Sequence, residues 1–171
     1  WQLWLFLALV LDCFAIAAQS LVGESLGASR LEEARATAWR VARYGTVTGA
    51  LVAVLLLLGR DVIPQLFSSD PGVLAGAATI WWWFALMQPL AGLVFALDGV
   101  LMGSGDVAFL RTLTLTAGLV GFLPLTLLSI PLGLGLHGIW AGITALIIIR
   151  LIGGCLRVRG GRWAVGGRGL G

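Results

Sequence analysis

Five long runs of apolar residues, separated by short polar stretches, organise this chain. They place candidate spans at residues 3–23, 41–58, 73–97, 112–130 and 138–156. Each run is close to the roughly 20 residues that cross a hydrocarbon core. Barrel strands would be shorter and would alternate in polarity, and only helices and closed barrels satisfy their backbone in lipid. The pattern therefore predicts an all-α fold, a polytopic transmembrane helix bundle of five spans. Pro131, Gly133 and Gly135 separate the last two spans.

Composition supports a membrane protein. The chain is 59% hydrophobic with a mean hydropathy of +1.00, and only 11% of its residues are charged. Soluble domains carry about 25% charged residues. Cys13 and Cys155 fall in the first and last spans, at a spacing that suits neither a disulfide nor a metal site. We therefore expect no metal and no cofactor. Because the chain opens at Trp1 inside an apolar run, we also expect it to be either the interior of a longer protein or a truncated reading frame.

Arginines supply all eleven basic residues and set the predicted orientation. The segments on one side carry most of them, namely Arg30, Arg35, Arg40, Arg43, Arg111, Arg157, Arg159, Arg162 and Arg168, whereas Arg60 lies on the other. The positive-inside rule then predicts that the N-terminus lies outside and the C-terminus is cytoplasmic. We expect a multi-pass protein of the plasma membrane. The arginines flank the apolar runs and form no patch with interleaved aromatics, which argues against a nucleic-acid partner.

Two polar segments lie outside the predicted spans. We expect residues 157–171, rich in glycine and arginine, to be a disordered cytoplasmic tail attracted to anionic lipid headgroups. The loop after the first span contains Glu24, Glu32 and Glu33 together with arginines. It is either a short amphipathic helix along the membrane surface or a charged, solvated connector. Membrane lipids are therefore expected partners.

Asp12 lies near the middle of the first span, with no basic residue close to it in sequence. A carboxylate at that depth costs several kcal/mol unless it is protonated, paired or facing water. On a helix Asp12, Ala15 and Gln19 fall on one stripe, which suits a water-filled cavity or a tight helix contact. Asp12 is accordingly a candidate cavity residue, and the alternative is a hydrogen bond to a neighbouring backbone that only fixes packing.

The third span carries further candidates. Pro89 removes a backbone donor and should kink the helix beside Gln88, a possible cavity residue. Asp98 lies further along and is expected to pair with Arg111 or to cap the next element, both structural or gating roles. Near the predicted outer end of the same span, three consecutive tryptophans are weaker cavity candidates: Trp81, Trp82 and Trp83.

Gly23-Glu24-Ser25-Leu26-Gly27 matches the G-x-S-x-G pattern of serine hydrolases. That pattern needs a strand-to-helix elbow and a nearby base, whereas here it ends a predicted membrane helix. The only histidine, His137, lies at the opposite end of a span, so about 30 Å of bilayer would separate it from Ser25. We expect no enzyme.

Several segments of the chain resemble a known family. The segment from Asp12 to Gly23, followed by Leu26-Gly27, resembles the D-G-F-A-x-A-A-x-x-x-x-G signature of MATE multidrug exporters, and more closely their DinF-like branch. Gln88-Pro89 and the segment from Leu97 to Gly103 resemble that branch's Q-P and L-D-G-x-x-x-G segments. Gly138-Ile139-Trp140 and Arg150 fit its last helix, while Cys13 replaces the usual glycine. The five spans would correspond to helices eight to twelve of the family's twelve.

The resemblance implies a secondary active antiporter that exports amphipathic or cationic organic compounds in exchange for H⁺ or Na⁺. Its two lobes would rock around a central cleft, and the partner would be an N-terminal lobe that holds the proton-binding aspartate. Asp12 and Gln19 would face the cleft, ahead of Gln88 and the three tryptophans. Two alternatives stay open: a lipid-linked oligosaccharide flippase of the same superfamily and a non-transporting membrane assembly subunit.

Overall fold

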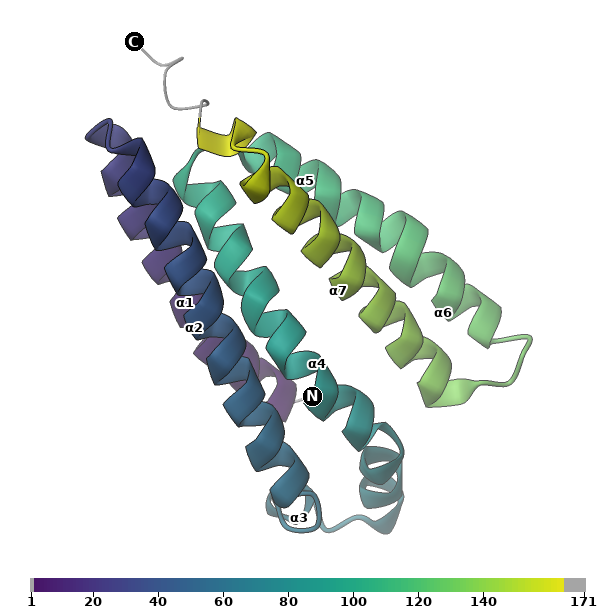
Figure 1. The fold of residues 1–171 in the computed structure, drawn as a ribbon. Coiled ribbons are helices and arrows are strands. Elements are labelled where there is room, and N and C mark those ends of the chain that lie inside the picture. Colours follow the sequence, from purple (N-terminus) through teal and green to yellow (C-terminus); the bar gives the residue numbers. More distant parts are fainter. Residues whose placement is uncertain (1, 165–171) are drawn as a thin grey trace.

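The computed structural model describes residues 2–164, which form helices and no strand (Figure 1). The helices are α1 (Gln2–Gly27), α2 (Leu31–Leu58), α3 (Ile63–Phe67), α4 (Pro71–Gly103), α5 (Val107–Thr116), the π-helical η1 (Ala117–Phe122), α6 (Leu123–Ser129) and α7 (Gly135–Arg159). The elements α5, η1 and α6 follow one another as a single span. Five helical spans are thus long and apolar enough to cross a membrane, which confirms the predicted fold class.

Local sequence explains where the longest helix begins. The Asp70 carboxylate accepts hydrogen bonds from the backbone N–H groups of Gly72 at 2.7 Å and Val73 at 3.1 Å. Pro71 occupies the first turn, where its missing N–H costs nothing. Before α7 the break predicted from glycine and proline is present, with Gly133 and Gly135 at φ +63° and +52°. Glycine adopts this left-handed conformation without strain.

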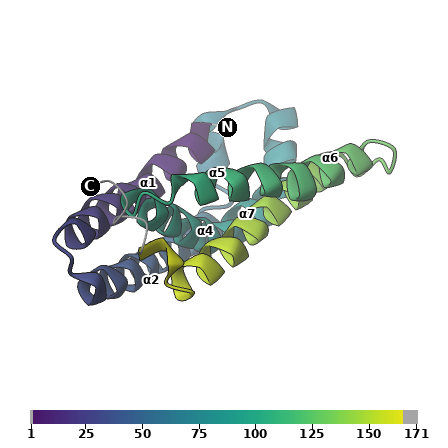
Figure 2. The same cartoon turned by 90° about the horizontal axis from the view of Figure 1, so that it is seen from above.

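The spans pack as a group of three and a group of two. α1, α2 and α4 pack against each other, and the α5–η1–α6 span runs along α7 (Figures 1 and 2). α4 belongs to the group of three and also contacts α7 and α5 of the other group. Small residues bring α2 and α4 together: a methyl group at Gly92 would collide with the Gly45 backbone, and one at Gly49 with the Gln88 backbone. Such small-residue contacts provide close packing where lipid supplies no hydrophobic driving force.

The bundle has two ends, which we name by the elements found there. At the α3 end lie the start of α1, the connection from α2 to α4, and the turn between α6 and α7 (Figure 1). At the α5 end lie the turn between α1 and α2, the start of α5 and the end of α7. The sequence predicts that the α5 end is cytoplasmic.

Both polar segments differ from expectation. A short turn at residues 28–30 takes the place of the expected surface helix or charged connector, because α2 begins at Leu31 and continues into the membrane run. A row of small buried residues on α2, including Ala34, Ala38 and Ala42, continues the helix-packing surface through the charged segment before the apolar run. The predicted disordered tail was wrong for residues 157–164: α7 runs to Arg159, and the Trp163 side chain is buried. Residues 165–171 lie outside the described residues.

Proline acts at two places within the spans. α4 stays one helix through Pro89, whose neighbour Gln88 has its backbone against Gly49. The π-helical η1 ends two residues before Pro124. Proline donates no backbone hydrogen bond and crowds the carbonyl four residues earlier, here Val120 within η1. The wider π-helical turn relieves that conflict, and such turns occur frequently at functional sites.

Candidate functional site

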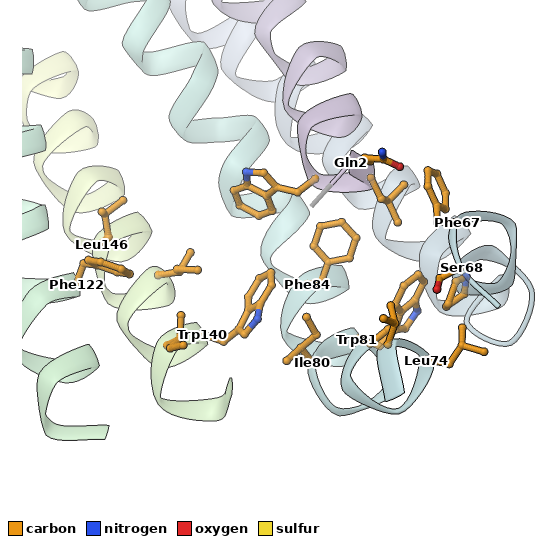
Figure 3. A pocket seen from close by; sticks show the side chains of 17 residues that line it. Gln2, Phe67, Ser68, Leu74, Ile80, Trp81, Phe84, Phe122, Trp140 and Leu146 are labelled. Carbon is orange, nitrogen blue, oxygen red and sulfur yellow. The ribbon is translucent and has the colours of Figure 1, made fainter. Parts of the chain in front are cut away.

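A large cavity opens between the two helix groups at the α3 end (Figure 3). Its volume is about 1010 Å³, at the upper end of the roughly 300–1,000 Å³ of ordinary ligand pockets. α1 and α4 form one wall, and η1 and α7 form the other, with the α3 segment at the rim. None of the 17 lining residues is ionisable, and the polar side chains among them are Gln2 and Ser68. The cavity suits a largely apolar ligand.

Aromatic rings dominate the cavity where the two walls meet. Trp4, Phe84 and Trp140 come from α1, α4 and α7, and each ring centroid lies 5.9–6.0 Å from the other two. Trp81 joins through Phe84 at 5.9 Å and donates its indole N–H to the Leu56 carbonyl at 2.8 Å. Tilted and edge-on pairs of this kind hold the rings in fixed orientations. The cluster therefore presents a preformed aromatic surface to a ligand.

Of the residues that the sequence proposed for a cavity, Trp81 is the one that lines this space. Trp82 is 54% exposed on the bundle surface, and Trp83 is partly buried outside the lining. Gln88 is buried, and its amide donates to the Phe84 carbonyl at 3.0 Å, so it supports the backbone beneath the aromatic cluster. The sequence did not identify four aromatic residues that line the cavity, namely Trp4, Phe84, Phe122 and Trp140. One signal in the sequence could have indicated two of them, because Trp4 and Trp140 fall at the same predicted end of the spans as Trp81.

Asp12 and Gln19 lie on α1 outside the cavity lining. Asp12 is partly buried, eight residues after Trp4, which is about 12 Å along the helix. Gln19 is exposed, and its backbone meets Gly103 of α4. The structure therefore places Asp12 deeper in the bundle than the aromatic cluster.

Two ion pairs attach α7 to the rest of the molecule at the α5 end. Asp98 on α4 accepts a hydrogen bond from Arg150, with side chains only 15% and 23% exposed. The expected pairing of Asp98 with Arg111 was wrong: α7 supplies the partner, and Arg111 is exposed on α5. Asp106 accepts two hydrogen bonds from Arg157, at 2.6 and 3.1 Å. Both pairs span more than 50 residues of sequence, so helix spacing alone could not reveal them.

Hydrolase geometry is not present at Ser25. Its hydroxyl donates to the Leu21 carbonyl at 2.9 Å, a bond within α1. His137 lies in the first turn of α7 at the α3 end, whereas Ser25 lies at the α5 end. Within residues 2–164 no group of three or more His, Cys, Asp or Glu side chains is arranged to hold a metal ion.

Comparisons with known proteins agree with this fold. The MatE family model matches residues 1–128. The chain is 31% identical over 164 residues to Protein DETOXIFICATION 45, chloroplastic, of Arabidopsis thaliana, covering 95% of this chain and 29% of that protein. It is 30% identical over 138 residues to Multidrug and toxin extrusion protein 2 of Mus musculus, covering 76% and 23% respectively.

A solved structure is similar as well. The crystal structure of the eukaryotic MATE transporter AtDTX14 superimposes with a TM-score of 0.87 at 25% sequence identity, covering 95% of this chain and 36% of that one. The chain therefore spans about a third or less of the proteins it resembles. Sequence, family model and fold lead to one assignment: this chain belongs to the MatE family of multi-pass membrane transporters.

Proposed function

We propose that the chain forms most of the C-terminal lobe of a multidrug-type exporter, and that the aromatic cavity at the α3 end binds its substrate. The observation that carries this proposal is the cluster of Trp4, Phe84 and Trp140 in an apolar cavity of about 1010 Å³. Aromatic faces attract organic cations, and apolar walls accept molecules of varied shape. The favoured substrate class is therefore an amphipathic or cationic aromatic compound.

Transport would couple export to the entry of H⁺ or Na⁺. The lining residues cannot bind either ion through a carboxylate, because none of them is ionisable. Asp12, about 12 Å along α1 from Trp4, is the protonatable group of this chain that we propose as a polar element of the same pathway. The primary coupling site would lie in an N-terminal lobe outside the chain.

Alternating access would come from rocking of that lobe against this one, as in other transporters built from two related halves. We propose the plasma membrane as the location, with the arginine-rich α5 end cytoplasmic, which places the aromatic cavity toward the outside. Release of substrate to the exterior would follow from this orientation.

Vesicles test the exchange directly. The full-length protein containing this chain would be reconstituted, loaded with a cationic aromatic dye, and exposed to a pH gradient or a Na⁺ gradient in separate arms. We expect dye movement driven by one of the two gradients. Dye movement that ignores both gradients would contradict antiport. Movement of a lipid-linked oligosaccharide without dye transport would instead favour a flippase, and inactivity of properly folded protein toward both would favour an assembly subunit.

A further inference from the structure

A second cavity, of about 400 Å³, lies between α1 and α2 at the α5 end, away from the aromatic cavity. Two facing stripes line it. Phe14, Ala17, Leu21 and Glu24 lie three or four residues apart on α1, and Glu33, Thr37, Arg40 and Tyr44 do so on α2. α1 and α2 are antiparallel neighbours (Figure 1), so Glu24, near the end of α1, and Glu33, near the start of α2, both lie at the outer rim. We call this space the rim groove.

Polarity in the rim groove changes with depth. Glu24 and Glu33 lie at the end of the bundle, where Arg30 pairs with both, at 3.6 and 2.9 Å. Arg40 lies seven residues after Glu33, about 10.5 Å further along the helix. Deeper still lie two aromatic rings, Phe14, which is partly buried, and Tyr44, which is 51% exposed with the Arg43 guanidinium over its ring at 5.7 Å. From the rim inward the order is therefore acidic, basic and aromatic.

The charges along the rim groove are complementary to those of a zwitterion. Glu24 and Glu33 together with Arg30 carry a net charge of −1 at the rim. Arg40 contributes +1 below them and makes no salt bridge within residues 2–164. A ligand with a cation at its outer end, an anion beneath it and an apolar tail would balance both sites. Glu24 and Glu33 are 72% and 52% exposed, so each charge contact would be weak alone and the ligand would be held by several charge-assisted hydrogen bonds acting together.

We propose that the rim groove binds a membrane phospholipid with an ethanolamine headgroup. Its ammonium would bond the carboxylates of Glu24 and Glu33, and its phosphodiester would accept hydrogen bonds from Arg40 and the Thr37 hydroxyl. An acyl chain would lie over Phe14 and Tyr44 and then along exposed Val47 and Leu51, which continue the stripe on α2. The ammonium of such a lipid is its outermost group, with the phosphate next, which matches the order found in the groove.

Other headgroups fit less well. A glycerol headgroup leaves the net −1 at the rim uncompensated, and a choline headgroup has no N–H to donate to the carboxylates. The proposal therefore predicts selectivity among headgroups of equal acyl composition, beyond general attraction of the basic α5 end to anionic lipid.

The test counts lipids bound to the purified chain by native mass spectrometry in detergent. Palmitoyl-oleoyl phospholipids with ethanolamine, choline or glycerol headgroups are titrated separately, and circular dichroism verifies that each variant is folded. We expect the ethanolamine lipid to be retained most. Arg40→Gln and Glu33→Gln should each weaken its retention roughly threefold, a typical value for a partly exposed charge contact. Ala17→Trp fills the groove without changing charge and should weaken retention of all three lipids.

Arg111→Gln is the matched control, since Arg111 is an exposed arginine at the same end but on α5, away from the groove. It should leave retention unchanged. The proposal is overturned if the three headgroups are retained equally, if the glycerol lipid is preferred, or if Arg111→Gln and Arg40→Gln have equal effects. Those results would describe ordinary lipid around the bundle. None of them depends on substrate binding at the α3 end, so this site and the proposed function fail separately.

Discussion

Charged side chains within the spans depend on partners that distant parts of the chain supply. Arg150 on α7 would be costly in lipid alone, and Asp98 on α4 compensates it. The Nε atom of Arg150 is buried without a hydrogen-bond partner in the described structure, so the ion pair with Asp98 is the main compensation for burying this arginine. The contribution of each side chain to stability therefore depends on the presence of the other.

Replacing Asp98 with Asn tests this dependence. The change leaves a mostly buried guanidinium without its counter-charge, which typically costs about 3 kcal/mol. We expect Asp98→Asn to lower the free energy of unfolding in detergent by about that amount. The double variant Asp98→Asn/Arg150→Gln should regain part of it, because no unpaired charge remains. A single variant as stable as the original chain would show that the pair contributes nothing.

Asp12 presents a different case, since it lies away from the cavity lining. If Asp12 is a polar element of the transport pathway, Asp12→Asn in the full-length protein should reduce dye export about tenfold, equivalent to roughly 1.4 kcal/mol. Protein abundance in the membrane should not change. Initial export rates in vesicles, normalised to the amount of inserted protein, provide the measurement. Unchanged export would leave Asp12 with a packing role only.

At the scale of helices, close contacts between small residues determine which elements meet. The Gly45 and Gly92 backbones touch across α2 and α4, so a side chain at either position would force the helices apart. The sequence shows small residues at helical spacing, but many faces of this chain share that pattern. Which helix packs against a given face can be seen only once α1, α2 and α4 are packed together.

Gly92→Ala tests the packing of α2 on α4. The added methyl group collides with the Gly45 backbone, and overpacking of this kind costs about 1–3 kcal/mol. Gly27→Ala is the matched control, because a methyl group there meets nothing within 4 Å. Thermal unfolding in detergent should show a clear loss for Gly92→Ala and none for Gly27→Ala. Equal melting temperatures would mean that the two helices separate at little cost.

Some elements follow from sequence and others do not. The five spans and the break at Gly133 were predictable because apolar run length and glycine are local signals. The start of α2 was not predictable, because the row of small residues that includes Ala34 and Ala38 is recognisable as a packing surface only when other helices are seen to cover it. The ion pair of Asp98 with Arg150 and the meeting of Trp4 with Trp140 likewise depend on contacts between residues far apart in sequence.

At the scale of the whole molecule, charge is unevenly divided between the two ends. Most arginines lie at the α5 end, whereas Arg60 lies at the α3 end. This asymmetry predicts that the α5 end is cytoplasmic and that the aromatic cavity faces outward. The orientation is therefore a property of the whole bundle that a single set of labelling experiments can determine.

Cysteine labelling in intact cells measures that orientation. With Cys13 and Cys155 replaced by serine, a single cysteine is introduced as Ser69→Cys near the start of α4 or as Ser29→Cys in the turn before α2. An impermeant maleimide should label the Ser69→Cys variant and should label the Ser29→Cys variant only after the membrane is opened. The reverse pattern would invert the proposed topology.

The central claim is that the aromatic cavity recognises a cationic aromatic substrate, and dye binding to the purified chain tests it most directly. Fluorescence titration should give saturable binding that Trp140→Ala weakens by about 2 kcal/mol, a roughly thirtyfold rise in Kd. Trp82→Ala removes an exposed tryptophan outside the cavity and should leave Kd unchanged. Equal affinities for the two variants, or binding that never saturates, would contradict the account.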